Sequence, residues 1–329
     1  MKIHRLLLVI AAVLLVLAPM SLAQTGKRYR VGFLSAGDFA PSAHPGRMTD
    51  EIVRDLAQNG FAPGVNLELV QRGAEGHFES LPALVAELVA ARVNVIATFG
   101  YPGAVAAKKG TSTVPIVIFG AGDPVKTGLV SSLNRPGGNV TGISDVAAEL
   151  APKRLELLKE AVPELKRVAM LWNANDLGMT MRYEASAAAA NGLGVSVESL
   201  GVREPNDFDD AFAAMERSMP DGLLMVADAL TMLNRKRVFD FAADHRLPAI
   251  YEEANFARDG GLMSYGPDEA ETAGLGTNLI VRILKGERPA DLPFEQPTLF
   301  RLVINLKTAK ALGLAVPPAL LAQADEVIE

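Results

Sequence analysis

The stretch Arg30-Val31-Gly32-Phe33-Leu34, which leads to Asp38, has a counterpart in Arg167-Val168-Ala169-Met170-Leu171, which leads to Asp176. Each stretch is typical of a first β-strand that ends in a small polar loop. A pattern that returns in the second part of a chain is what a fold made of two similar halves produces. We therefore expect two halves, each of which begins with such a strand.

Short apolar runs, rich in β-branched residues, recur along the chain and predict parallel strands that are covered on both faces. Segments with helical spacing separate them, with Asp50 and Asp207 at expected N-cap positions. This alternation predicts an α/β fold with two Rossmann-like lobes. The expected strands are 29–34, 65–70, 93–99, 115–119, 167–172, 195–200, 222–226, 248–251 and 262–265, and the clearest helices are 81–91, 154–161, 211–215 and 277–284.

Composition excludes several classes of protein. The chain has 329 residues, of which 49% are hydrophobic and 21% charged, and this length and composition suit two packed domains. It has no cysteine, which excludes disulfides, thiolate metal sites and a thiol nucleophile. The formal net charge of −6 argues against nucleic acid as a partner.

Residues 1–23 have the pattern of a secretory signal peptide. Lys2 and Arg5 precede an apolar run over 6–17, and Ser21-Leu22-Ala23 places small residues at −3 and −1 before Gln24. The run is shorter than the roughly 20 residues of a membrane span, which disfavours an anchor. We expect an exported protein, periplasmic if the source has two membranes.

Polar residues gather directly after the expected strands, where ligands bind in open α/β sheets. Each of them is also an ordinary turn or cap residue, but the set on one rim predicts a ligand cleft. Pro102 and Pro124 suit the first turn of a helix, which has free N–H groups for a carboxylate. The expected ligand-binding residues are Ser35, Gly100, Tyr101, Ala104, Asp123, Asn173, Asn175, Asp228, Glu252 and Tyr265.

Catalytic and cofactor motifs are missing. No glycine-rich loop ends in Gly-Lys-Ser/Thr, and Gly274-Leu275-Gly276 lacks the third glycine of a dinucleotide fingerprint. No pair of histidines or carboxylates has metal-ligand spacing on one helix. We expect no catalytic residue, no cofactor and no metal, and hence no enzyme.

Several blocks carry a more specific signal: Gly122-Asp123-Pro124-Val125, residues 135–142, Lys153-Arg154-Leu155-Glu156-Leu157-Leu158-Lys159, Gly260-Gly261-Leu262-Met263-Ser264-Tyr265-Gly266 and residues 304–314. Together they resemble the ABC-transporter substrate-binding protein family that includes the tryptophan/tyrosine-binding proteins. The resemblance covers essentially the whole mature chain. It implies a type I periplasmic-binding-protein fold, in which two lobes joined by three crossovers close on a ligand.

The resemblance also implies a division of the chain. We expect residues 28–142 plus 267–291 in lobe 1 and 143–266 plus 292–329 in lobe 2, with crossovers near 142–145, 265–267 and 291–297. In the aromatic amino-acid branch, the segment after the strand ending at Val226 reads Thr-Asp-Asn. Here it reads Ala227-Asp228-Ala229, which keeps the acid and loses the amide.

The leading interpretation is a monomeric, secreted solute-binding protein that captures a small organic ligand and delivers it to the permease and ATPase subunits of an ABC importer. We expect the ligand to carry a carboxylate near the N–H groups of Tyr101 to Ala104, and an apolar, aromatic or amino-acid-like body. Tyr101, Trp172 and Tyr265 are the aromatic residues nearest to strand ends. The alternatives are an exported enzyme that uses Asp123, Asp228 or Glu252 as acid or base, and a ligand-sensing domain.

The signal peptide generates the first prediction. Exported protein should begin at Gln24, because Ala23 presents the small side chain that the peptidase requires at −1. N-terminal sequencing of the secreted chain checks this, and Ala23→Leu should block processing. An exported chain that still begins at Met1 contradicts the prediction.

Overall fold

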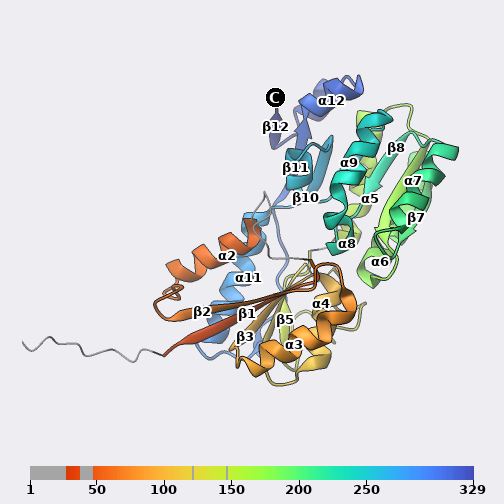
Figure 1. The fold of residues 1–329 in the computed structure, drawn as a ribbon. Coiled ribbons are helices and arrows are strands. Elements are labelled where there is room, and N and C mark those ends of the chain that lie inside the picture. Colours follow the sequence, from red (N-terminus) through yellow and green to blue (C-terminus); the bar gives the residue numbers. More distant parts are fainter. Residues whose placement is uncertain (1–26, 38–46, 121, 146) are drawn as a thin grey trace, which may run out of the picture.

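The computed structural model describes residues 27–37, 47–120, 122–145 and 147–329. The signal peptide and Asp38 lie outside the described residues. Two groups of strands and helices follow each other along the chain (Figure 1). We call the first sheet with the helices packed on it the first lobe, and the second sheet with its helices the second lobe.

The first sheet has five parallel strands in the order β2-β1-β3-β4-β5. Because side chains alternate along a strand, the sheet buries two faces. Val31 and Phe33 pack under α2 and α11, whereas Leu34 and Ile96 pack under α3 and α4. The elements are β1 (Tyr29–Ser35), α2 (Arg47–Gln58), β2 (Leu67–Gly73), the 3-10 turn η1 (Phe78–Ser80), α3 (Leu81–Ala90), β3 (Val95–Phe99), α4 (Gly100–Gly110), β4 (Ile116–Phe119), β5 (Val140–Gly142) and α11 (Glu269–Leu284).

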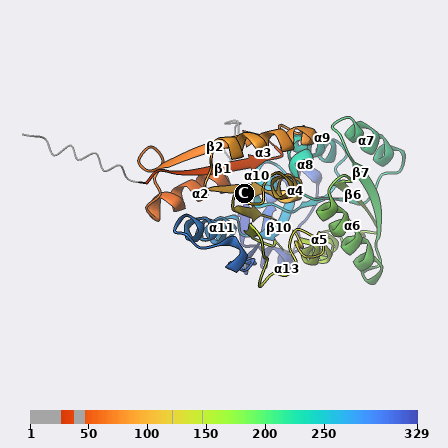
Figure 2. The same cartoon turned by 90° about the horizontal axis from the view of Figure 1, so that it is seen from below.

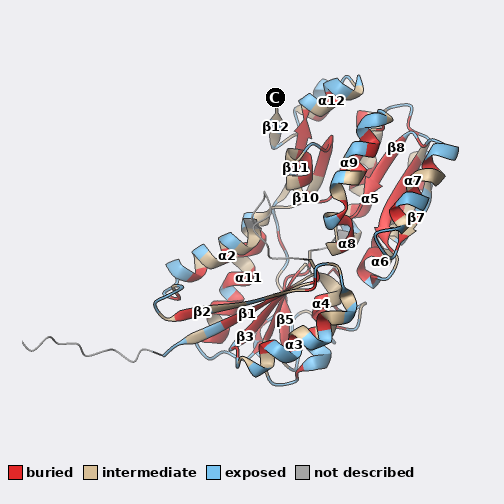
Figure 3. Cartoon of the chain, viewed as in Figure 1, coloured by how far each residue is buried: buried red, intermediate tan, exposed pale blue. Residues whose placement is uncertain are grey.

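The second sheet has seven strands in the order β12-β11-β10-β9-β8-β6-β7, and only β10 and β11 pair antiparallel. Its central strands β6, β8 and β9 are buried, whereas the edge strands β7 and β12 and the outer helix faces are largely exposed or half-buried (Figure 3). The strands are β6 (Arg167–Asn173), β7 (Ser196–Val202), β8 (Gly222–Met225), β9 (Ala249–Tyr251), β10 (Met263–Pro267), β11 (Phe300–Asn305) and β12 (Glu326–Ile328). The helices are α5 (Ala147–Ala161), α6 (Leu177–Ala190), α7 (Asp207–Arg217), α8 (Ala229–Leu233), α9 (Arg235–Asp244), α10 (Ala254–Arg258), α12 (Leu306–Leu312) and α13 (Pro318–Leu321), with 3-10 turns η2 (Asn191–Leu193) and η3 (Pro289–Asp291).

The expected α/β fold and every expected strand are present. The two expected N-caps are wrong: Asp50 lies inside the first turn of α2, and Asn206 rather than Asp207 caps α7. An acidic side chain inside the first turn still faces the positive end of the helix dipole, so both positions favour an acid. The helix expected after Pro124 is also wrong, because residues 124–128 form a turn that ends at Gly128 with a φ of 75°.

The connections between the two lobes run close together. The main-chain N–H of Glu295 donates to the carbonyl of Gly142, and that of Ser144 donates to the carbonyl of Glu295, at 3.0 and 2.9 Å. The N–H of Asp268 donates to the carbonyl of Leu299 at 2.9 Å. Figure 2 shows the two lobes side by side. The lobe boundaries given above remain a prediction.

Two glycines of α11 provide a test of how this helix packs on the first sheet. A Cβ added at Gly276 would lie 2.1 Å from the buried ring of Phe119, whereas one added at Gly274 meets nothing within 4 Å. Gly276→Ala should therefore destabilise the protein by about 1–3 kcal/mol through overpacking. Gly274→Ala should stabilise it by about 0.5–1 kcal/mol, because alanine favours a helix. Urea unfolding of both variants measures the difference, and equal effects would contradict this packing.

Candidate functional site

The carboxyl ends of the two sheets meet at one junction between the lobes. A Cβ added at Gly178, in the first turn of α6, would lie 3.9 Å from Cβ of Tyr101, in the first turn of α4. Phe78 of the first lobe packs against the core of the second, and Ala229 of the second packs against the core of the first. We call this region the interlobe junction; α4 and α6 approach it from its two sides (Figure 1).

On the first lobe, α4 begins at Gly100, whose φ of 73° suits glycine. The N–H groups of Gly100 and Tyr101 belong to the first turn and lack helical partners. Pro102 has no N–H, and Ala104 is fully buried in the core of the first lobe. The expected anion site over Tyr101 to Ala104 is therefore shorter: it reduces to the two N–H groups of Gly100 and Tyr101.

Two other expected residues of the first lobe make local hydrogen bonds. Ser35 Oγ accepts from the N–H of Gly37 at 3.0 Å. Asp123 Oδ1 accepts from the N–H groups of Val125 and Lys126 at 3.1 and 3.0 Å. Partial burial raises the pKa of Asp123, but the N–H and ammonium of Lys126 outweigh this and hold the pKa below its usual value. Asp123 thus caps the turn after Pro124.

On the second lobe, Asn173 and Asp228 bind each other. Asn173 Nδ2 donates to Asp228 Oδ2, and Asn173 Oδ1 accepts from the N–H of Asn175 at 2.9 Å. Asp228 also caps α8 in a capping box, in which Oδ1 accepts from the N–H of Thr231 at 2.8 Å. Burial raises the pKa of Asp228 against the effect of these bonds.

Glu252 lies at the centre of a buried ionic network. It pairs with Nη1 of Arg154 at 2.7 Å and with Nη1 of Arg182 at 3.2 Å. It also accepts from the N–H of Ala227 at 2.9 Å. Arg182 Nη2 pairs with Oδ2 of Asp145 at 2.9 Å. Every charge in this set is taken up within the protein, and the network binds α5, α6, the end of β9 and the first connection together.

A second carboxyl, that of the half-buried Glu253, follows directly. Burial, and then the neighbouring charges of Glu269 and Glu252, raise its pKa to about 8. Glu253 therefore holds its proton more tightly than an ordinary glutamate does.

Comparison with known proteins places the chain in a family. Residues 41–328 match the family model described as ABC transporter substrate binding protein. The chain belongs to this family. A curated tyrosine-binding protein of Clostridioides difficile is 25% identical over 80% of this chain and 75% of its own length.

Two solved structures of relatives, both 25% identical, inform the arrangement of the lobes. An ABC domain from Streptococcus pneumoniae in complex with L-Trp has a TM-score of 0.82 and covers 92% of this substrate-binding protein and 100% of its own chain. A ligand-free, open substrate-binding protein from Clostridium difficile has a TM-score of only 0.64 over 92% of this chain and 99% of its own. The lobes described here are therefore arranged more like those of the L-Trp complex.

The expected site residues divide into those at the junction and those built into cores. Tyr101 stands beside Gly178 at the junction. Tyr265 is half-buried, packs on the second-lobe core, and accepts from Arg154 Nε through its main-chain carbonyl at 2.7 Å. Trp172 belongs to the core: its ring stacks on Tyr183 with centroids 5.1 Å apart, and its Nε1 donates to Ser199.

Sequence reasoning missed Arg154, Arg182, Asp145 and Asp176 as residues of the site. A signal was present for Arg154, which lies on the same buried stripe of α5 as Ala151, Leu155 and Leu158. A charged side chain at helical spacing within an apolar stripe must find a buried partner. That partner, Glu252, lies 98 positions further along the chain, so the spacing of residues on one helix cannot identify it.

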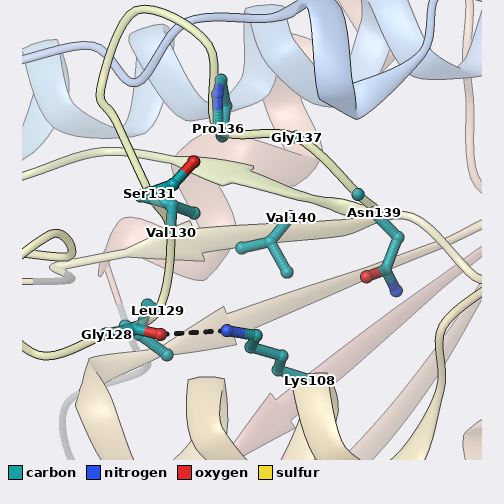
Figure 4. Close-up of a pocket in the computed structure, with 10 residues that line it drawn as sticks. Lys108, Gly128, Leu129, Val130, Ser131, Pro136, Gly137, Asn139 and Val140 are labelled. Atoms are coloured by element: carbon teal, nitrogen blue, oxygen red, sulfur yellow. Dashed lines mark hydrogen bonds between the residues drawn. The ribbon is translucent and has the colours of Figure 1, made fainter.

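A cavity of about 470 Å³ lies elsewhere, between Lys108, the loop 128–139 and Val140. Figure 4 shows the ammonium of Lys108 directed at the carbonyl of Gly128, to which it donates at 3.0 Å. Asn139 Nδ2 is likewise bound to the carbonyls of Thr111 and Val114. Lys108 and Asn139 of this cavity bind the chain itself, and the cavity lies at the start of β5 rather than at strand carboxyl ends. We therefore place the candidate site at the interlobe junction.

Over the described ranges, no cluster of three histidine or acidic side chains is arranged to hold a metal ion. None of the helices described is both long and apolar enough to traverse a bilayer.

The ionic network generates a stability prediction. Arg154→Met should lower the free energy of unfolding by about 3 kcal/mol, because it removes one of the two arginines that compensate the buried carboxylate of Glu252. Arg167→Met, which breaks an exposed pair with Glu198, serves as the matched control and should cost at most about 1 kcal/mol. Urea unfolding measures both variants. Equal losses would mean that the Glu252 network does not hold the second lobe together.

Proposed function

We propose that this protein captures a small, carboxylate-bearing ligand between its two lobes and delivers it to an ABC importer. The observation that carries the proposal is the meeting of α4 and α6, each by its first turn, at the interlobe junction. A helix N-terminus presents free N–H groups and the positive end of a dipole, which favour an anion. A ligand held there contacts both lobes at once.

The ligand class proposed is an aromatic amino acid or a close analogue. Tyr101 offers an aromatic ring beside the N–H groups that would hold a carboxylate, and a ring of this kind stacks on an apolar or aromatic body. Family relatives support the choice, since one is described as tyrosine-binding and another as a complex with L-Trp. The Ala227-Asp228-Ala229 segment lacks an amide there, so tyrosine and related ligands are to be tested beside tryptophan.

Binding should favour the closed arrangement, because a ligand that contacts both lobes gains contacts that the open form cannot make. The three proposed crossovers, near 142–145, 265–267 and 291–297, would serve as the hinge. The similarity to the L-Trp complex supports this mechanism.

The remaining parts of the proposal follow from the family. The mature protein would act in the periplasm as a monomer, after removal of residues 1–23, and would dock on permease and ATPase subunits. It would need no cofactor and bind no nucleic acid. An enzymatic role for Asp123, Asp228 or Glu252 gains no support, since each is engaged in hydrogen bonds or ion pairs within the chain.

The test of this function combines binding with shape. Titration calorimetry of the mature protein with L-tyrosine and L-tryptophan should give saturable binding, and small-angle scattering should show compaction at saturation. A ligand that co-purifies should appear in native mass spectrometry. Absence of binding to both amino acids would refute the ligand class, and binding without compaction would refute hinge closure.

Tyr101→Ala should weaken this binding by about 1 kcal/mol or more, on the order of one lost aromatic contact. Tyr29→Ala is the matched control: Tyr29 is also half-buried, but it packs on Phe61 at the start of β1. It should leave binding unchanged. If both variants bind equally well, Tyr101 is a packing residue and the site lies elsewhere.

A further inference from the structure

Asp176 carries a carboxylate oxygen for which the described residues supply no hydrogen-bond donor. It directly precedes α6, and its Oδ1 caps that helix by accepting from the N–H groups of Gly178 and Met179 at 2.7 and 3.2 Å. Its Oδ2 is buried and unpartnered, although the residue as a whole is only 1% exposed. Buried carboxylate oxygens are normally satisfied, so this atom calls for a donor other than those that the described residues supply.

The position of the carboxyl group indicates where that partner would come from. Its charged and titratable neighbours are Asp228 and Arg182 of the second lobe, and Tyr101 of the first lobe also feels its charge. Because groups of both lobes surround it, the carboxyl group lies at the interlobe junction. An opening of the lobes would expose Oδ2 to water, whereas closure would strand it without a donor unless a ligand supplies one.

Asp228 and Glu252, the two acids expected from the sequence to receive a cationic group, have both oxygens engaged. Asp228 Oδ2 accepts from Asn173 and its Oδ1 from Thr231. Glu252 pairs with Arg154 through one oxygen and with Arg182 through the other. Of these three acids, Asp176 is therefore the one with an oxygen left for a donor from the ligand.

The two helix ends at the junction also differ in charge. The first turn of α4 contains no acidic residue and has no side-chain cap, whereas α6 is capped by Asp176 itself. A ligand carboxylate would be repelled most strongly beside Asp176 and the adjacent Asp228, and less at α4, whose first turn has no acid of its own. A cationic group would be attracted to α6. The charges thus orient a zwitterion, with its carboxylate at α4 and its ammonium at α6.

We propose that Asp176 receives the ammonium group of the ligand through Oδ2 and is the residue that makes the site specific for amino acids over the corresponding deaminated acids. The inference rests on the proposed capture function and names the group that sets its specificity. It replaces the sequence-based assignment of this role to Asp228 or Glu252.

A dependence on pH accompanies this role. Burial, and then the charge of Asp228, raise the pKa of Asp176 to about 6, while Arg182 acts in the opposite direction. Below that pH the carboxyl group takes up a proton and loses its attraction for an ammonium. Affinity for an amino acid should therefore fall as the pH is lowered from 7.5 to 5, and binding in that range should release protons.

The experiment compares ligands that differ only in the amine. Titration calorimetry of the mature protein uses L-tryptophan and L-tyrosine, together with indole-3-propionate and 3-(4-hydroxyphenyl)propionate. The wild type should bind the preferred amino acid at least tenfold more tightly than its deaminated partner. Asp176→Asn keeps a side chain that caps helices well, so it should remove this preference and the loss of affinity at low pH, without lowering the melting temperature of the ligand-free protein.

Asp221→Asn is the matched control. Asp221 Oδ2 also accepts main-chain N–H groups, those of Lys166 and Arg167, but at the start of β6 and away from the junction. This variant should bind all four compounds as the wild type does.

The outcomes separate this inference from the function on which it rests. If Asp176→Asn weakens the binding of amino acids and of deaminated acids equally, or leaves the binding of both unchanged, Asp176 is only a helix cap. The inference then fails, while the proposed capture function stands. The same holds if the wild type binds both kinds of compound equally well. If the wild type binds none of the four compounds, the proposed ligand class fails and the inference fails with it.

Discussion

The pairing of Glu252 with two buried arginines is the constraint on which the interlobe junction depends. A guanidinium without water requires a carboxylate within reach, and Arg154 and Arg182 share one. Because they come from α5 and α6 while Glu252 directly follows β9, their pairing fixes the positions of these three elements relative to one another. Asp145 extends the constraint into the connection between the lobes. A buried ionic network is weak as a source of stability, but it tolerates few alternative arrangements.

The consequence for binding is an ordered set of charges at the junction. With Glu252 and Asp228 occupied by the protein's own donors, the second lobe presents Asp176 at the start of α6. The first lobe presents the uncapped start of α4. Two similar α/β halves thus meet through helix ends of opposite character. This asymmetry is what a binding site needs in order to hold a ligand that carries both charges in one orientation.

The strands and the fold class could be predicted because each strand is a local signal. The apolar runs of β1 and β6 are continuous, since both faces of each strand are buried. The strands not expected have weak local signals: β5 and β12 have three residues each, and β11 begins with a half-buried and an exposed residue. Trp172 shows the limit for single residues, because a position near a strand end does not reveal whether a ring such as that of Tyr183 already covers it.

The sequence by itself determined the repeated α/β pattern and the strand ends at which polar residues gather. Its motif blocks also indicated the substrate-binding protein family. These depend on neighbours a few positions apart, which periodicity records. Only the tertiary structure decided which acid is free. Asp176, Asp228 and Glu252 all follow strands and look alike in sequence, but their partners come from α6, β6 and α5. The donors that satisfy Asp228 and Glu252, Asn173 and Arg154, lie far away in the chain, and folding alone brings them together.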